Sequence, residues 1–528
     1  MKLRIWVDAL GAGAATGLIA EVLVMRTNPE VTQTMSGVLV GIPLWASWGM
    51  LMVGVPLLIG LAVFERLRPK ADRWLAPKLF TAVFGVSTVL TAVNAKLHAL
   101  LLSGPAHRVL VQDSVAWGVA AVLAVTAASA VRRFGGGGGW RIAFSIVMIV
   151  LPVVRLMTSP TPPRQYLEVE PQPLGEPNRQ LLVIGLEGLD AKVLLADAAS
   201  ASYPHLARLR EEGVRAPLTP HRPYLRWALW TSVATGTYPG RHGVKAHRGW
   251  DLPPVFSETL RLLPWTPEGS RMILPWGLSK QVPPPPATVA PLWSRLDASG
   301  VATEVIGWPG SWGDDPSLQT APSDEVGAVL EPTMRTSLEA ALEPFPDRRS
   351  RIWSGIVRDQ ARVELAVDAL GADVANVWIH LETLSLARRY HEPLRPRHTR
   401  ERLFLELVME LVDGQIGELL GAVDGRALVA VVSPFGLAPP GSFERMKRLF
   451  GGGESWHTTA EGSPDGLFIL LGDGVNSGSR VQPVNPPDVA PTLCYLLGLP
   501  VAQYMEGSVV VNAVEPSFLS EHPLRVVD

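Results

Sequence analysis

Long apolar runs separated by short polar loops fill the first part of the chain. The runs cover residues 5–25, 38–64, 79–102, 115–131 and 142–157. Helices of this length and composition can cross the hydrocarbon core of a bilayer. The pattern therefore predicts a membrane domain over residues 1–158, with about five transmembrane α-helices and the lipid bilayer as its first partner.

Basic residues in the loops indicate which way this domain faces. They lie before the first run, between the second and third, and between the fourth and fifth, at Lys2, Arg4, Arg66, Arg68, Lys70, Arg73, Lys78, Arg132, Arg133 and Arg141. Cytoplasmic loops carry such an excess. We therefore expect a cytoplasmic N-terminus and an extracytoplasmic C-terminal part, in a bacterial periplasm or at a cell surface.

After residue 158 the pattern changes to short apolar runs alternating with amphipathic stretches. Residues 159–179 are rich in proline, which predicts a semi-rigid linker. Strands are then predicted at 181–186, 301–306, 374–381, 427–433 and 467–471, and helices at 204–213, 225–236, 335–342, 358–370, 400–420 and 488–497. Such alternation predicts an α/β domain over residues 180–528, with helices on both faces of a sheet.

A proline-heavy segment, residues 251–291, interrupts this alternation, and its apolar residues show neither helical nor strand periodicity. We expect it to be a surface insertion or a lid over the carboxyl edge of the sheet.

The first strand of the α/β domain ends in an acidic residue. Residues 181–186 are continuously apolar, which is typical of a central parallel strand buried on both faces, and Glu187 follows directly. Ligand sites of open α/β sheets lie beyond the carboxyl ends of such strands. Glu187 therefore stands where a catalytic or metal-binding carboxylate is expected.

Composition excludes several classes of function. The chain has 528 residues, a formal net charge of −2 and one cysteine, Cys494. A nearly neutral chain lacks the basic footprint of a nucleic-acid-binding protein. A single cysteine excludes an intrachain disulfide and a cysteine-rich zinc site. The mean hydropathy of +0.20 is high for a soluble protein, because the apolar excess lies in the membrane half.

Eight segments of the second half occur in an order that resembles one family. They are VIGLEGLD (183–190), YPHLARLREEGV (203–214), LWTSVATGTYPGRHGV (229–244), VIGWPGSW (305–312), VWIHLETLSLARRY (377–390), VVSPFGLAPP (431–440), SPDGLFILLGDGV (463–475) and DVAPTLCYLLGLPVAQYMEG (488–507). The series resembles the type I phosphodiesterase/nucleotide pyrophosphatase branch of the alkaline phosphatase superfamily over residues 180–511. The resemblance implies an alkaline-phosphatase-like, mostly parallel sheet and, in active members, a two-zinc hydrolase site.

Position by position, the resemblance implies a site that has lost its chemistry. In active members Asp and His side chains hold two zinc ions about 4 Å apart, and a Ser or Thr attacks phosphorus. Here the first ligand position holds Glu187, and the nucleophile position, ten residues before Gly236, holds Arg226. The other ligand positions hold Ser385, Arg389, Pro434, Phe435 and Gly462. An intact scaffold without these ligands predicts a pseudoenzyme with no catalytic residue and no bound metal.

Three functions follow as alternatives. The first is an accessory subunit that binds protein partners in a membrane complex. The second, which the family name implies, is a two-zinc hydrolase of phosphodiesters or sulfate-like esters. The third is an anion pocket, formed by Arg226 and Arg389, that binds a phosphate-bearing lipid or glycan without turnover.

For Glu187 itself we favour an ion pair over a metal ligand. A buried carboxylate needs a cationic partner, and Arg226 and Arg389 converge on it if the family geometry holds. Thr231 and Ser232 are candidates for a displaced nucleophile, but hydroxyls within a helix are expected to bond back to the preceding turn.

Two further groups of residues are candidates for a site. His380 and Glu382 have the spacing to share one face of a strand, yet a metal site there would need a third converging ligand. His242 belongs to a segment that the resemblance implies is structural. The tryptophan-rich loops could form a cleft or an interface, although ordinary packing explains most of them; they contain Trp227, Trp230, Trp250, Trp265, Trp276, Trp308 and Trp312.

Overall fold

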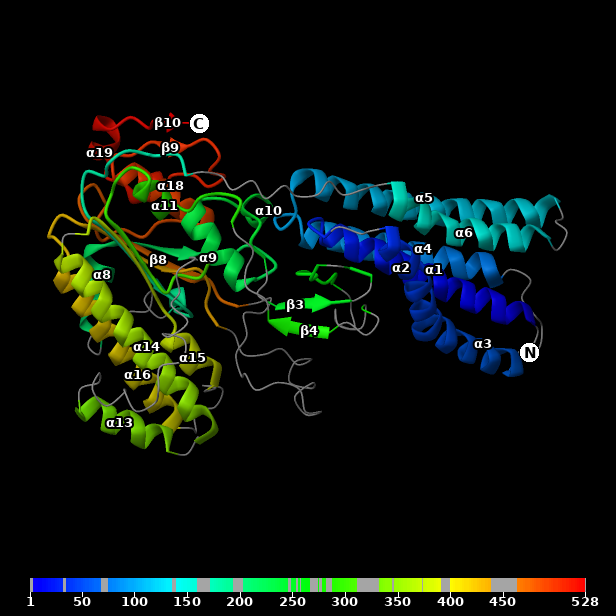
Figure 1. The fold of residues 1–528 in the computed structure, drawn as a ribbon, viewed down its shortest axis with the longest axis horizontal. Coiled ribbons are helices and arrows are strands. Elements are labelled where there is room, and N and C mark those ends of the chain that lie inside the picture. Colours follow the sequence, from blue (N-terminus) through cyan, green and yellow to red (C-terminus); the bar gives the residue numbers. More distant parts are fainter. Residues whose placement is uncertain are drawn as a thin grey trace. The chain divides into compact units, whose positions relative to one another are not determined.

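The structure is a computed structural model in which the chain forms two compact units (Figure 1). One consists of Met1–Leu167 with Lys245–Pro285, and the other of Glu168–Val244 with Pro286–Asp528. The structure describes residues 3–31, 35–67, 75–134, 139–158, 171–192, 203–245, 248–252, 255–256, 258–265, 274, 278–281, 287–310, 332–343, 346–372, 374–390, 399–437 and 463–527. Each unit is described here by itself.

The first unit is built from apolar helices. They are α1 (Leu3–Thr27), α2 (Met35–Gly49), the π-helix η1 (Met50–Gly54), α3 (Val55–Leu67), α4 (Leu75–Leu97), α5 (Gly104–Phe134) and α6 (Gly139–Thr158). Among the described residues, four stretches are long and apolar enough to cross a membrane, namely Ile5–Thr27, Ser36–Phe64, Lys78–Leu97 and Gly104–Ala130; a shorter one covers Ile146–Met157. The prediction of apolar N-terminal helices is confirmed.

Glycines bring α1 into backbone contact with the helix that follows it. A Cβ atom added at Gly17 would lie 1.9 Å from the carbonyl oxygen of Trp45, and one at Gly49 would lie 2.1 Å from that of Gly13. Small residues at such crossings allow transmembrane helices to pack closely without a hydrophobic driving force. The sequence therefore packs α1 tightly against α2 and η1.

The expected surface insertion or lid, residues 251–291, is divided between the two units, because residues up to 285 belong to the helical unit and 286–291 to the other. Strand β3 (Arg248–Asp251) ends at the first residue of this segment and forms a hairpin with β4 (Leu278–Gln281). Apolar side chains of the segment join a buried cluster that also contains helix residues; the members include Leu252, Val255, Phe256, Leu260, Leu263, Trp45, Phe84 and Trp117. Pro283–Pro286 lie outside the described residues.

Two asparagine side chains at helix ends hold the backbone of this segment. Asn28, just after α1, donates from Nδ2 to the Leu262 carbonyl at 2.7 Å and accepts the Leu262 amide at 2.9 Å. Asn94, in the last turn of α4, pairs in the same way with Trp265, at 3.0 and 2.7 Å. These amide–peptide pairs satisfy backbone groups that would otherwise be buried without partners.

The second unit is organised around a six-stranded sheet. Its strands are β1 (Leu181–Leu186), β2 (Val214–Leu218), β5 (Thr303–Ile306), β6 (Asn376–Leu381), β7 (Leu428–Ser433) and β8 (Gly466–Leu471), in the order β2-β8-β7-β1-β6-β5. β1 is central and pairs in parallel with β6 and β7, β5 pairs in parallel with β6, and β8 runs antiparallel to β7 and β2. The predicted α/β fold with a mostly parallel sheet is confirmed.

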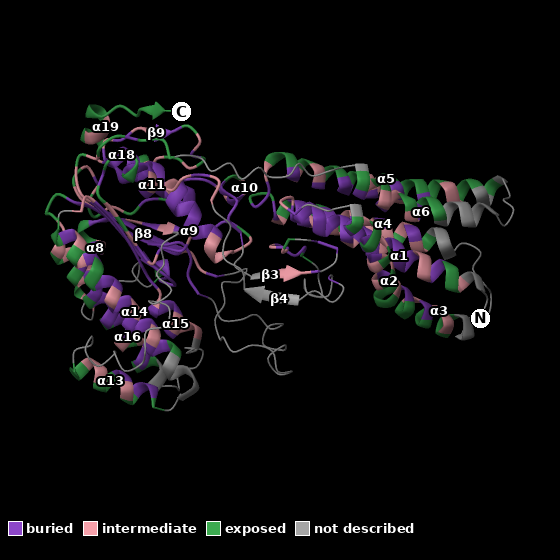
Figure 2. Cartoon of the chain, in the orientation of Figure 1, coloured by how far each residue is buried: buried purple, intermediate pink, exposed green. Residues whose placement is uncertain are grey.

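Helices cover both faces of the sheet, so β1 is buried on each side. Leu181 and Val183 pack in a cluster with α9 (Arg226–Thr235), α11 (Leu292–Asp297) and α18 (Val489–Leu496). Leu182, Ile184 and Leu186 pack on the other face with α8 (Pro204–Glu212), α13 (Pro332–Leu342), α14 (Pro346–Gly371) and α16 (Thr399–Ala422). Figure 2 shows the central strands and α9 as buried.

Shorter elements complete the unit. They are α10 (Pro239–His242), α15 (Thr383–Tyr390), η5 (Pro486–Asp488), β9 (Val501–Ala502), η6 (Val511–Ala513), α19 (Pro516–Glu521) and β10 (Val526–Val527). The end of the predicted linker already belongs to this unit: Leu174 is buried, and its amide donates to Ser299 Oγ at 2.9 Å. Residues 159–170 of that linker lie outside the described residues.

Candidate functional site

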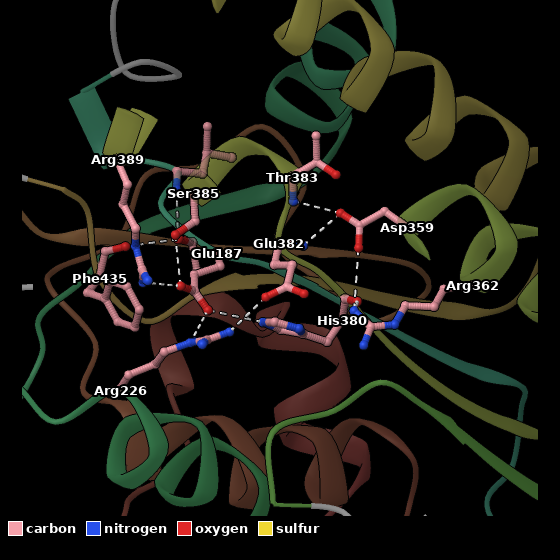
Figure 3. A network of polar contacts seen from close by, with 12 residues as sticks. Glu187, Arg226, Asp359, Arg362, His380, Glu382, Thr383, Ser385, Arg389 and Phe435 are labelled. Atoms are coloured by element: carbon pink, nitrogen blue, oxygen red, sulfur yellow. Dashed lines mark hydrogen bonds and ion pairs between the residues drawn. The ribbon is translucent and has the colours of Figure 1, made fainter. Parts of the chain in front are cut away.

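The carboxyl ends of β1 and β6 meet at one edge of the sheet, where they place Glu187 among cationic side chains (Figure 3). Glu187 follows β1 directly, and its residue surface is only 1% exposed. Arg226 reaches it from the first position of α9, and Arg389 reaches it from α15. The structure thus brings together the three residues of the predicted charge cluster.

Both carboxylate oxygens of Glu187 are engaged. Oε1 accepts hydrogen bonds from Ser385 Oγ at 2.8 Å and from Arg389 Nη2 at 2.6 Å. Oε2 accepts one from Arg226 Nε and lies 3.5 Å from His380 Nε2. Burial alone would raise the pKa of Glu187, but the charges of Arg226 and Arg389 outweigh burial and hold that pKa well below its ordinary value of 4.5. Glu187 is therefore ionised at neutral pH.

A second carboxylate, Glu382, extends the cluster. It accepts a hydrogen bond from Arg226 Nη2 at 3.3 Å and forms an ion pair with Arg358 Nη2 at 2.5 Å. Burial would raise the pKa of Glu382, yet the two guanidiniums lower it. Because burial also lowers the pKa of His380, that ring is neutral at neutral pH. Three guanidiniums thus face two carboxylates, which leaves one excess positive charge in this part of the described structure.

The start of α15 is held in place by an aspartate from α14. Asp359 Oδ2 accepts the amides of Glu382 and Thr383 at 2.8 and 2.7 Å, which satisfies free N–H groups of the first helical turn. Arg362 pairs with the other oxygen of Asp359 at 3.4 Å. Gly307, with φ of +64°, gives Arg362 its space, because a Cβ there would lie 2.2 Å from the guanidinium.

Beneath the cluster lies an aromatic layer. The rings of Trp230 and His380 meet edge to face at 4.7 Å between centroids, and Trp230 and Trp308 do so at 5.0 Å. A Cβ at Gly185 of β1 would lie 3.0 Å from both tryptophan rings, so glycine is needed there. Trp230 and Trp308 are thus core residues, as ordinary packing predicts, while Trp276 and Trp312 lie outside the described residues.

The other predicted ligand positions at the end of β7 hold apolar side chains. Phe435 is fully buried and belongs to the core cluster on one face of the sheet, and Pro434 beside it is also buried. Ser433 orders this turn, because its hydroxyl accepts the Leu189 amide at 3.1 Å and donates to the Phe435 carbonyl at 3.2 Å. Gly462 lies outside the described residues.

The two hydroxyls considered as displaced nucleophiles differ. Thr231 bonds back to the carbonyl four residues earlier at 2.9 Å, as predicted. The same prediction is wrong for Ser232, whose Oγ lies 3.0 Å from His242 Nε2 and 3.2 Å from His221 Nε2. Burial lowers the pKa of His221 to about 4, so its neutral ring can accept from Ser232. Ser232 is fully buried, which removes it from any substrate.

The residues that the structure describes do not fit a pair of zinc ions. Among the described residues, no three His, Cys, Asp or Glu side chains are grouped so that they could hold a metal ion. The single acidic ligand position, Glu187, already receives two guanidiniums and a hydroxyl. A catalytic zinc ion needs three protein ligands and an open position, which this arrangement does not offer.

Sequence reasoning missed several charged residues that build the site. Arg358 and Asp359 come from α14, and Arg388 pairs with Asp190 at 2.7 Å beside the cluster. Each of these residues pairs with a residue at least 23 positions away in the chain, so no short sequence motif identifies the pair. The signal that was available is the adjacent pair Arg388 and Arg389 within the resembling segment 377–390.

Comparisons with known proteins agree with the resemblance. The family model described as type I phosphodiesterase/nucleotide pyrophosphatase matches residues 181–461. Among solved structures, murine ectonucleotide pyrophosphatase/phosphodiesterase 5 is similar, with 11% identity and a TM-score of 0.41, covering 64% of this chain and 100% of that one. A putative sulfatase from Bacteroides thetaiotaomicron has 13% identity and a TM-score of 0.38, covering 64% and 74%. No sequence among the curated proteins matches this chain.

We expect Glu187→Gln to destabilise the protein by about 1–3 kcal/mol at neutral pH, because it removes the buried counter-charge of the partly exposed guanidiniums of Arg226 and Arg389. The folded-state pKa of Glu187 is lowered, so its contribution is complete above the ordinary value of 4.5 and is lost as the pH falls below it. Denaturant unfolding of both chains from pH 7 to pH 3 measures this: the difference between them should shrink on acidification.

The matched control is Glu212→Gln, which removes a carboxylate from an exposed pair with Arg208. Exposed pairs contribute at most about 1 kcal/mol, so this control should change little. A Glu187→Gln chain as stable as the control at neutral pH would contradict the role assigned to the cluster.

Proposed function

Because the chain belongs to the type I phosphodiesterase/nucleotide pyrophosphatase family, we propose that it is a membrane-anchored, non-catalytic member that acts by binding. The observation that carries this proposal is the ion pair between Arg226, at the nucleophile position, and Glu187, at the first ligand position. A guanidinium has no lone pair with which to attack phosphorus, and it repels a metal ion from the carboxylate it contacts.

The chemistry of phosphoryl displacement explains why this change matters. The reaction needs an attacking oxygen and cations that stabilise the charge developing on the attacking and leaving oxygens. Arg226, Arg358 and Arg389 supply cationic charge, but their N–H groups are directed at Glu187 and Glu382. The cluster therefore holds the fold together at a place where active members bind metal, and this supports a role in binding or assembly.

The proposed setting follows from the apolar helices and the basic loops. We infer an integral membrane protein whose N-terminus is cytoplasmic and whose phosphodiesterase-like domain lies outside the cytoplasm, in the periplasm or at the cell surface. A domain of this kind on a multi-span anchor suits an accessory subunit of a membrane complex. The fold by itself does not identify the partner.

A second candidate function is that of a receptor for a phosphate group, without turnover. It is favoured by the excess positive charge of the cluster and by Arg389, whose side chain is 26% exposed and pairs with Glu187 through Nη2. A guanidinium can donate further N–H groups to a phosphoryl oxygen of a lipid or glycan.

The proposed inactivity predicts that purified full-length protein holds far less than one zinc ion per chain after incubation with zinc and dialysis. It should also hydrolyse an aryl phosphodiester at the background rate. Arg226→Thr restores a hydroxyl but no ligands, so it should remain inactive. Elemental analysis and a colorimetric assay measure this, and about two zinc ions per chain with turnover would establish the hydrolase alternative.

The assembly role predicts a stoichiometric protein partner in the native membrane. Native mass spectrometry of the tagged chain, extracted with mild detergent from its own membranes, should show a complex heavier than any multiple of this chain. Only free chain or its own oligomers would contradict the assembly role.

The receptor role predicts that millimolar inorganic phosphate raises the melting temperature of the full-length protein. Arg389→Met should abolish this rise. The control Arg402→Met, which removes an arginine whose side chain is 75% exposed on α16, should leave the rise unchanged. If phosphate stabilises Arg389→Met as much as wild type, this candidate function is eliminated.

A further inference from the structure

A second buried charge cluster lies within the helical unit, far along the chain from Glu187. Arg26 stands in the last turn of α1, Arg155 in the last turn of α6, and Asp113 in the first third of α5. Arg26 Nε donates to Asp113 Oδ2 at 2.8 Å, and Arg155 Nε donates to Oδ1 at 2.6 Å. Arg26 Nη2 also donates to the Arg155 carbonyl at 2.8 Å. We name these three residues the helix-end triad.

The helix-end triad carries an unbalanced charge. Asp113 uses one oxygen for each guanidinium, and no second carboxylate pairs with Arg26 or Arg155 among the residues that the structure describes. The side chains of Arg26 and Asp113 are only 2% and 1% exposed. One excess positive charge is thus enclosed by apolar helices, where an unpaired charge is costly and a counter-anion is favoured.

Arg155 is the accessible member of the triad. Its side chain is 21% exposed, so an anion could approach it from outside the unit. Its Nη2 is buried and forms an ion pair with Asp113 Oδ1 without a hydrogen bond. Because Nε also binds Asp113, Nη1 is the nitrogen of Arg155 for which the described residues provide no partner.

The position of the triad along the helices matches a bilayer surface. α1 ends at Thr27 and α6 at Thr158, so Arg26 and Arg155 lie within about one helical turn of the ends of their helices. Helices that span the hydrocarbon core end near the level of the lipid headgroups. This step rests on the proposal that the apolar helices cross a membrane, but not on the chemistry at Glu187.

We propose that the helix-end triad binds the phosphate of an anionic lipid headgroup, with Arg155 in direct contact and Arg26 adding charge from behind. Basic pockets between transmembrane helices bind such headgroups, and a guanidinium suits a phosphate because it can donate two parallel hydrogen bonds. Asp113 holds both arginines in place and cancels half of their charge.

The test compares full-length protein in bilayer discs of phosphatidylcholine with discs that also contain phosphatidylglycerol. Arg155→Met leaves Arg26 and Asp113 as a neutral pair. Wild type should retain phosphatidylglycerol about fivefold over the bulk mixture, and this enrichment should disappear in Arg155→Met. Phosphatidylglycerol should raise the melting temperature of the wild-type protein and should not raise that of Arg155→Met. Arg108→Met, an exposed residue near the same end of α5, is the matched control and should behave as wild type.

Two results would overturn the proposal. Wild-type protein without enrichment of phosphatidylglycerol refutes it, even if Arg155→Met fails to fold. Equal enrichment in wild type and Arg155→Met also refutes it. A third arm adds inorganic phosphate to phosphatidylcholine discs: stabilisation equal to that given by phosphatidylglycerol would assign the triad to a soluble anion instead of a lipid.

Discussion

The ion pairs of Glu187 are the interaction on which the sheet edge depends. A carboxylate that is 1% exposed cannot stay ionised without nearby positive charge, because burial favours its neutral form. Arg226 and Arg389 supply that charge from two helices, α9 and α15, that lie far apart in the sequence. The start of α9 and the body of α15 are thereby fixed against the end of β1. Removing either arginine would leave Glu187 with one cationic partner in place of two.

The same constraint explains both charged sites of the chain. At the sheet edge three guanidiniums face two carboxylates, and in the helix-end triad two guanidiniums face one. In each place the buried carboxylates are paired, and at least one of the arginines around them is partly exposed, Arg226 and Arg389 in the first and Arg155 in the second. The unbalanced positive charge thus lies where it is partly exposed, and water, an anion or a headgroup can balance it there. This common arrangement is why Arg389 and Arg155 are candidates for ligand contact.

Sequence patterns predicted what depends on local periodicity. The continuous apolar runs identified β1, β7 and β8, and the amphipathic stretches identified α16 and α18 to within a few residues. β2 was missed because its half-buried edge carries Arg215 and Pro217, which weaken the strand signal. The packing of the proline-heavy segment depends on Asn28 and Asn94, which lie more than a hundred residues away in the chain. The meeting of Glu187, Arg226 and Arg389 followed from the ordered resemblance, whereas Arg358 and Asp359 had no local signature.

Each carboxylate of the cluster has more than one cationic partner, and this explains how the domain can keep its fold when one of those residues changes. If Arg226 were replaced by a hydroxyl residue, Glu187 would still accept from Arg389 and Ser385, and Glu382 would still pair with Arg358. Phe435 and Pro434 would continue to place apolar atoms at two of the predicted ligand positions. Among the described residues, a change at Arg226 alone would therefore leave the other ion pairs of the cluster in place. The sheet places the groups, but the sum of their charges and hydrogen bonds decides what the site can bind.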